Sequence, residues 1–200
     1  MESSETPLLF ILSGPAGSGK TTLCNRLLAE FDTLERIVTA TTREMRAGEL
    51  DGEDYFFFSQ EQFEQKVEND ELLEWALVHG RAYGTPKAEV VRRFQNAQDV
   101  LLSIDVQGMR QVLEKAESVE WLRNRVVTIF IQPPSLDELR TRLKARGTDS
   151  TEEIERRIET ARTELQSAKE FHYLLETSSK DEDFDRVRAI YLAEKMRPRR

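Results

Sequence analysis

Residues 8–21 read Leu-Leu-Phe-Ile-Leu-Ser-Gly-Pro-Ala-Gly-Ser-Gly-Lys-Thr, an apolar run followed directly by a glycine-rich loop. From Gly14 to Thr21 the loop fits the pattern G-x-x-x-x-G-K-[ST], which is typical of phosphate-binding loops. Glycine permits backbone conformations in which several N–H groups point toward one phosphate. The apolar spacing that follows predicts a helix over residues 21–31, and the positive end of its dipole would face the phosphates.

This loop predicts an ATP site. Lys20 would place a mobile positive charge on the transferred phosphate and is a candidate catalytic residue. The Thr21 hydroxyl would ligate Mg²⁺, the expected cofactor bound with ATP. The residues expected to bind ATP are Gly14, Pro15, Ala16, Gly17, Ser18, Gly19, Lys20, Thr21 and Thr22.

Composition narrows the class of protein. The 200 residues carry a net charge of −8, with 38% hydrophobic and 33% charged residues, as expected for one soluble globular domain. The negative balance disfavours nucleic acid as a partner, and no long apolar run indicates a membrane partner. The single cysteine, Cys24, rules out an internal disulfide and fits a reducing compartment. Residues 1–5 lack the basic start and apolar core of a signal peptide, so we expect a cytoplasmic protein.

Strand-like runs alternate with helix-like segments along the chain, at residues 8–13, 100–104, 126–131 and 173–175. This alternation predicts an α/β fold of three layers with a parallel central sheet. We expect a single domain over residues 1–200, with its core in 7–36 and 86–144 and the C-terminal part of the core in 159–200.

Two segments interrupt the alternation. Residues 37–85 contain strand-like stretches at 38–42, 55–58 and 72–79 and a helix-like stretch at 60–67, which predicts an inserted α+β subdomain. Residues 145–158 combine a Gly-Thr-Asp-Ser turn with a highly charged helix, which predicts an exposed, mobile lid with little buried surface. Ser135 and Ser150 each precede a glutamate by three residues and predict helix starts, as does Thr85 before Pro86.

The insertion carries a second motif, Thr-Thr-Arg-Glu-Met-Arg-Ala-Gly-Glu over residues 41–49, followed by Asp54-Tyr55. Arg43 and Arg46 are close enough in sequence to converge on one anion. The pattern resembles the monophosphate site of the guanylate kinase family, T-T-R-x-x-R-x-G-E-x-x-G-x-D-Y. The resemblance continues through residues 73–75, 83–85, 104–108 and 146–148 to Arg157, and so covers nearly the whole chain.

The resemblance implies an enzyme that moves the γ-phosphoryl group of ATP to GMP in purine metabolism. Arginines and tyrosines would hold the GMP phosphate, and the carboxylate of Glu74 would accept both donors on the guanine edge. Adenine lacks those donors and would leave the buried carboxylate unpaired. The residues that match the GMP site are Thr39, Arg43, Arg46, Glu49, Tyr55, Glu74, Tyr83, Thr85 and Asp105.

The family also carries lid arginines, which match Arg142, Arg146 and Arg157 here. Together with Lys20 and Arg43 they form the expected catalytic set, although a solvated helix face remains an alternative for Arg142 and Arg146. Asp105 matches an acid that lies between base and metal, and its role stays open between the two. Two positions depart from the family pattern. Ser103 replaces a common acid, and Thr177 replaces the asparagine near the adenine ring.

Two other functions share parts of this pattern. Non-catalytic guanylate-kinase-like modules use the monophosphate site to bind phosphorylated peptides, but such a binder would not need Lys20, Thr21 or the lid arginines. A kinase for another nucleoside monophosphate is disfavoured by Glu74. The expected partners are the two substrates, ATP and GMP. The sequence does not identify a protein partner.

Overall fold

The computed structural model describes residues 6–78, 80–147 and 149–198 and contains two sheets. The larger sheet has five parallel strands in the order β2-β7-β1-β8-β9, formed by Leu34–Arg36, Asp99–Ser103, Leu9–Ser13, Val126–Gln132 and Tyr173–Glu176. Four of these strands match the predicted runs. The three-residue edge strand β2 was not predicted, because its Leu-Glu-Arg sequence shows no apolar run.

Helices cover both faces of this sheet, as predicted for a three-layer α/β fold. Alternate residues of β1 point to opposite faces. On one face Phe10 and Leu12 pack with helices α1 (Lys20–Glu30) and α7 (Lys180–Met196). On the other face Leu9 and Ile11 pack with α3 (Lys87–Gln95) and α4 (Val106–Ser118). Cys24 belongs to the first of these cores, where burial raises its thiol pKa to about 11.

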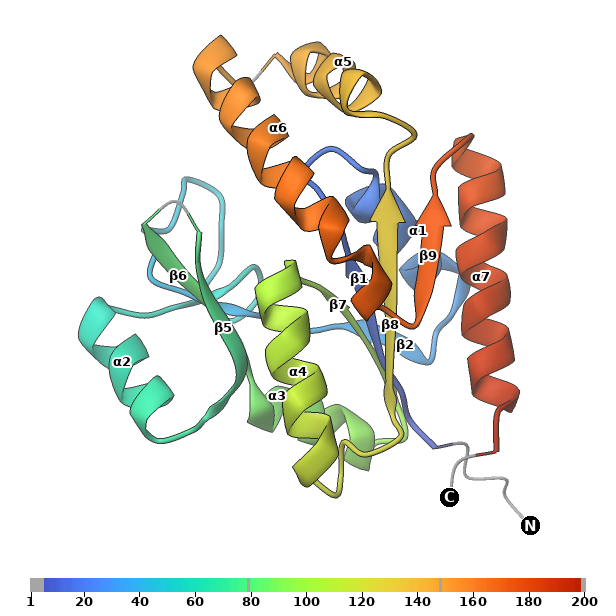
Figure 1. Ribbon diagram of the computed structural model, residues 1–200. Helices are drawn as coiled ribbons and strands as arrows, with labels where there is room; N and C mark the ends of the chain where they lie inside the picture. Colours follow the sequence, from blue (N-terminus) through green and yellow to red (C-terminus); the bar gives the residue numbers. More distant parts are fainter. Residues whose placement is uncertain (1–5, 79, 148, 199–200) are drawn as a thin grey trace.

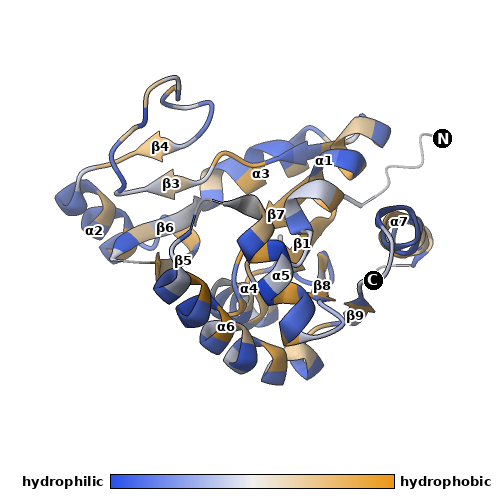
Figure 2. Ribbon diagram, turned by 90° about the horizontal axis from the view of Figure 1, so that it is seen from above, coloured by the Kyte–Doolittle hydropathy of each residue, from blue (hydrophilic) through white to orange (hydrophobic). Residues whose placement is uncertain are grey.

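The second sheet has the strand order β4-β3-β6-β5, formed by Phe56–Phe57, Ala40–Thr41, Arg81–Pro86 and Leu72–Val78. Its pairs are antiparallel except for β3 with β4. Figure 2, seen from above, shows this sheet beside the larger one, with α2 (Gln60–Glu68) on the side away from the larger sheet, where Phe63 packs with residues of the smaller sheet. The predicted strands at 38–42, 55–58 and 72–79 correspond to β3, β4 and β5, although residue 79 lies outside the described residues.

One predicted helix is present but begins one residue later than expected. Thr85 and Pro86 were expected to begin a helix, but both belong to β6, and α3 begins at Lys87 with Pro86 as its N-cap. The Thr85 side chain makes no cap hydrogen bond, because it is buried and bonded to Glu74 on the neighbouring strand. The pairing of β6 with β5 and β3 therefore overrides the local cap signal.

Two helices, α5 (Leu136–Arg146) and α6 (Thr151–Gln166), lie above the carboxyl ends of β1 and β8 (Figure 1). Ser135 and Ser150 cap them as predicted, accepting hydrogen bonds from Glu138 N and Glu153 N. The helices share a small core that buries Ile154 and Ile158, so this segment buries more than its charged composition suggested. Among the described residues, no helix has the length and apolar character that crossing a membrane requires.

Candidate active site

The glycine-rich loop connects the buried strand β1 to α1. Gly14 has φ of +135°, and a Cβ there would lie 2.3 Å from the carbonyl oxygen of Ile131, so no other residue fits this turn. Gly19 is the N-cap of α1 in a left-handed conformation. The helix therefore begins at Lys20, directly after the loop, and directs its free N–H groups and positive dipole end toward a bound anion.

Polar groups converge on this loop. The ammonium of Lys20 donates to the carbonyl oxygens of Gly14 at 2.5 Å and Pro15 at 2.9 Å, which holds it over the loop. The hydroxyls of Ser13 and Ser18 are buried and have no hydrogen-bond partner among the described residues. Buried polar groups in this state are costly unless a ligand satisfies them, so the loop is suited to a phosphate-bearing molecule.

The donor set also fits Mg²⁺ bound with a nucleotide. Thr21, on the first turn of α1, lines a small cavity of about 110 Å³ together with Asn25, Arg36 and Ser103. Hydroxyl oxygens are ligands that Mg²⁺ accepts, usually alongside water and phosphate oxygens. Within the described ranges no group of three or more His, Cys, Asp or Glu side chains could hold a metal by itself.

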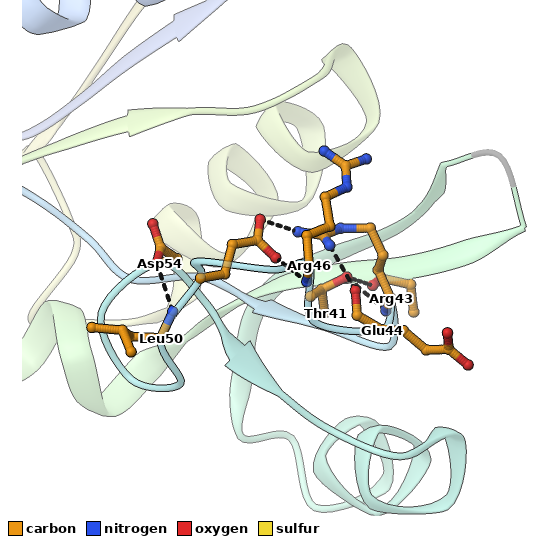
Figure 3. A network of polar contacts seen from close by, with 8 residues as sticks. Thr41, Arg43, Glu44, Arg46, Leu50 and Asp54 are labelled. Carbon is orange, nitrogen blue, oxygen red and sulfur yellow. Dashed lines mark hydrogen bonds and ion pairs between the residues drawn. The ribbon is translucent and has the colours of Figure 1, made fainter.

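Arg43 and Arg46 follow β3 in the second sheet, and Figure 3 shows them within one polar network. Oε1 of Glu49 accepts from the Arg43 guanidinium at 2.7 Å, while Oε2 accepts from the backbone N–H of Arg46 at 2.8 Å. The ion pair with Glu49 raises the pKa of Arg43 and lowers that of Glu49. Glu49 therefore orients Arg43 and closes the Arg43–Glu49 loop.

Two tyrosines flank Arg43. Its guanidinium carbon lies 5.4 Å from the ring centre of Tyr55, and the Tyr55 and Tyr83 rings are 6.0 Å apart. Tyr83 also contributes to the raised pKa of Arg43, after the larger effect of Glu49. The arginine and two phenol groups thus lie together, as an anion site requires.

A cavity of about 230 Å³ lies between the second sheet and the carboxyl end of β7. Five of the predicted GMP residues line it, namely Thr39, Tyr55, Glu74, Tyr83 and Asp105. Thr85 lies buried behind Glu74, while Arg43, Arg46 and Glu49 are not among its lining residues. Arg36 also lines the cavity and was not identified from the sequence, because nothing local distinguishes it on the short strand β2.

Glu74 is the buried carboxylate of this cavity, with 4% of its surface exposed. Burial raises its pKa to about 7; the Thr85 hydroxyl, which donates to Oε1 at 2.5 Å, opposes the rise, and the Asp105 carboxylate adds to it. Asp105 is the N-cap of α4 and accepts from Gly108 N at 2.8 Å. A buried carboxylate is costly unless hydrogen-bond donors satisfy it, so a ligand in this cavity should present donors to Glu74.

A larger cleft of about 790 Å³ lies between the glycine-rich loop, the end of β5, α4 and α6. Ala16, Asp105 and Arg157 line it, as does Glu164, two turns after Arg157 on the same helix. Burial raises the pKa of Glu164, Lys20 opposes the rise and Asp105 adds to it. Sequence reasoning missed Glu164, although its seven-residue spacing from Arg157 placed both on one face of the helix.

The predicted lid arginines differ in position. Arg157 pairs with Glu153 at 3.1 Å and Asp149 at 3.2 Å, beside the cleft. Arg142 is on α5, where it pairs with Glu138 at 3.0 Å and donates to the Thr177 hydroxyl at 3.4 Å. The side chain of Arg146 and residue 148 lie outside the described residues.

Helix α5 contacts the glycine-rich loop directly. A Cβ at Gly17 would lie 3.1 Å from Leu139 Cδ1 and 3.2 Å from Leu143 Cδ2, and Gly17 has φ of +92°. The loop therefore packs against the shared core of α5 and α6. Because protein interiors are close-packed, a shift of these helices would displace the glycine-rich loop.

Comparisons with known proteins agree with this geometry. A family model described as guanylate kinase matches residues 6–194. A guanylate kinase of Novosphingobium aromaticivorans is 47% identical over 190 residues, covering 95% of this chain and 83% of that protein. A guanylate kinase of Caldanaerobacter subterraneus subsp. tengcongensis is 43% identical over 197 residues, covering 98% and 92% respectively.

A solved structure is similar over nearly the same length. The crystal structure of guanylate kinase from Anaplasma phagocytophilum has a TM-score of 0.74 and 31% identity, covering 96% of this chain and 88% of that chain. Sequence, fold and the arrangement of a glycine-rich phosphate loop beside a buried carboxylate thus lead to one assignment. This chain belongs to the guanylate kinase family.

Proposed function

We propose a division of roles among the site residues of this enzyme, a phosphotransferase that moves the γ-phosphoryl group of ATP to GMP and gives ADP and GDP. One observation carries the proposal. Asp105 lines both the 230 Å³ cavity that contains Glu74 and the 790 Å³ cleft that contains Ala16 of the phosphate loop and Arg157. The acceptor pocket and the donor cleft therefore adjoin, as direct transfer between two nucleotides requires.

GMP would bind with its base in the cavity and its phosphate at the Arg43–Glu49 loop. The ionised Glu74 carboxylate would accept hydrogen bonds from guanine N1–H and the 2-amino group. Thr39 and Asp105 would complete the base pocket, and Thr85 would support Glu74 from behind it. Arg43, Arg46, Tyr55 and Tyr83 would donate to the phosphate, and Glu49 would orient both arginines.

ATP would bind at the loop Gly14–Thr22. The backbone N–H groups and Lys20 would hold the β- and γ-phosphates, and the Thr21 hydroxyl would hold Mg²⁺, which when bound supplies charge neutralisation and phosphate alignment. Lys20 now donates to the carbonyls of Gly14 and Pro15 and would transfer its hydrogen bonds to phosphate oxygens. Arg142, Arg146 and Arg157 would add positive charge as the lid closes.

The reaction then needs positioning more than covalent chemistry. An oxygen of the GMP phosphate attacks the γ-phosphorus of ATP, and the bond from that phosphorus to the bridging oxygen of ADP breaks. Lys20, Arg43 and Arg157 stabilise the negative charge spread over the transferred group. Closure of α5 and α6 would exclude water and suppress ATP hydrolysis.

The alternative, a non-catalytic module that binds phosphorylated peptides, lacks support from the comparisons, whose named relatives are guanylate kinases. The negative net charge argues against nucleic-acid partners. The single cysteine, Cys24, is buried and fits a reducing compartment, so a cytoplasmic location stays a prediction. Partners other than the two nucleotides are not defined by the site.

A coupled assay of ADP production tests this proposal. The protein is given ATP and Mg²⁺ with GMP, AMP, CMP or UMP in turn, and GMP is expected to give the highest kcat/KM by at least two orders of magnitude. Equal rates with AMP would contradict the role of Glu74. Absence of turnover with every nucleotide, together with binding of a phosphorylated peptide, would favour the binding module.

A further inference from the structure

The strand that carries Glu74 is held from outside its sheet by a side chain of α4. Because β5 is the edge strand, the outer backbone groups of Trp75 have no strand partner in the described part of the chain. The amide of Gln111 takes both: its Oε1 accepts from Trp75 N at 3.0 Å, and its Nε2 donates to Trp75 O at 2.7 Å. Gln111 thus replaces a neighbouring strand at the residue directly after Glu74.

A second residue of α4 lies against the Glu74 carboxylate itself. A Cβ on Gly108 would be 2.5 Å from Glu74 Oε2 and 3.2 Å from Glu74 Cδ. The contact with Oε2 is shorter than those that real Cβ atoms make, so only glycine allows the carboxylate its observed position. Gly108 has no left-handed φ, so its backbone conformation does not require glycine. The requirement comes from the approach of Glu74.

A third residue extends the same side of the helix. Lys115 donates to the carbonyl of Leu72 at 2.7 Å and pairs with Asp70 at 3.2 Å, near the start of β5. Residues 108, 111 and 115 recur at three- and four-residue spacing, which places them on one helix face. That face contacts β5 from its first residue to the carboxylate of Glu74.

We infer that α4 sets the position of the guanine-recognising carboxylate, with Gly108 and Gln111 as positioning residues for Glu74. Gly108 leaves the space that Oε2 occupies, and Gln111 holds the backbone next to it. With Thr85 bonded to Oε1, the carboxylate is held from both sides. This inference rests on the proposed role of Glu74 in base recognition and extends it to two residues that would not touch the nucleotide.

A pair of related substrates separates positioning from general structure. Inosine monophosphate has the N1–H of guanine but no 2-amino group, so the GMP-to-IMP ratio of kcat/KM reports how well Glu74 accepts both donors. Gln111→Met removes both hydrogen bonds at similar volume, and it should lower this ratio about tenfold, mostly through a raised KM for GMP. Loss of folded protein would instead lower activity with both substrates equally.

The matched control is Glu114→Met, which introduces the same side chain at an exposed position of the same helix, and it should keep the wild-type ratio. Gly108→Ala is the second test. Alanine favours a helix interior over glycine, so the melting temperature should not fall from helix propensity, while the ratio should fall at least tenfold because the carboxylate is displaced.

The outcomes are distinguishable. A wild-type enzyme that does not prefer GMP to IMP and AMP would overturn the role of Glu74 itself. A wild-type enzyme with that preference, whose ratio stays unchanged in both Gln111→Met and Gly108→Ala, would overturn only the positioning role of α4. A lowered ratio in both variants, with Glu114→Met unchanged, supports it.

Discussion

Thr85 donates a hydrogen bond of 2.5 Å to Oε1 of Glu74, across two antiparallel strands on which the two residues pair directly. Both side chains are buried. The hydroxyl gives the carboxylate a partner inside the protein and leaves the rest of its acceptor capacity for a ligand, since a carboxylate offers about four lone-pair sites. The pair is therefore the structural basis of base recognition in the proposed function.

Removal of the Thr85 hydroxyl should weaken GMP recognition. Thr85→Val keeps the shape but leaves Glu74 with one partner fewer, which should lower kcat/KM for GMP by roughly tenfold or more, the effect of about 1.5–3 kcal/mol for a lost hydrogen bond to a charged group. Steady-state kinetics with GMP titrated at saturating ATP measures this. Thr85→Ser keeps the donor and should retain most activity; equal losses in both variants would contradict the role of the hydroxyl.

Activity with GMP should depend on pH through Glu74. Burial raises the pKa of this carboxyl to about 7, and only its ionised form can accept both guanine donors. As pH falls through about 7, protonation should lower kcat/KM for GMP. A pH–rate profile from pH 5.5 to 8.5 measures this. In Glu74→Gln the transition should vanish and discrimination of GMP from AMP should fall by roughly 1–3 kcal/mol; a transition that persists would belong to another group.

The same raised pKa predicts a stability cost. In the unfolded chain Glu74 ionises near its ordinary pKa of 4.5, whereas in the folded protein it holds its proton up to about 7. The unfolded state is therefore favoured progressively between these values, and the full cost, up to about 3 kcal/mol, applies above pH 7. Urea unfolding should show Glu74→Gln more stable than wild type at pH 8, with the gain largely lost at pH 4. A gain that does not change with pH would rule out this explanation.

Replacement of Lys20 should abolish turnover without unfolding the protein. Lys20 contacts the loop carbonyls of Gly14 and Pro15 and belongs to no hydrophobic core, so Lys20→Ala should keep its melting temperature within a few degrees. The loss of charge at the transferred phosphate should reduce kcat by at least 10³-fold. Lys169→Ala, at an exposed position, serves as the control. A folded Lys20→Ala protein with near wild-type kcat would contradict the proposed ATP site.

Substitutions of two arginines should distinguish binding of GMP in the ground state from catalysis. Arg43 is held beside Tyr55 by Glu49 before any substrate binds, so Arg43→Met should strongly raise KM for GMP. Arg157 is paired with Glu153 and Asp149 and should engage the phosphates on closure, so Arg157→Met should lower kcat more than GMP affinity. Kinetics with GMP titrated at saturating ATP distinguishes them. If Arg157→Met changes KM alone, Arg157 belongs with the ground-state binding residues.

The sequence by itself determined the parts of the protein that are built from contiguous residues. The loop from Gly14 to Thr21 requires its glycines for backbone conformation, and the helix that starts at Lys20 follows from local apolar spacing. The same holds for the caps at Ser135 and Ser150 and for the contiguous apolar runs that form the buried strands, though not for the pairing of those strands. Such features depend on interactions within a few residues, which is the range that a sequence pattern can report.

Only the tertiary structure decided the contacts between distant segments. Thr85 looked like a helix cap and is instead a strand residue bonded to Glu74, because pairing of β6 on both sides outweighs one local hydrogen bond. The fit of Gly108 against Glu74 and the bonds of Gln111 to Trp75 join residues more than 30 positions apart. Their chemistry depends on how α4 packs against β5, and that packing comes from burial shared across the whole fold, which no local pattern encodes.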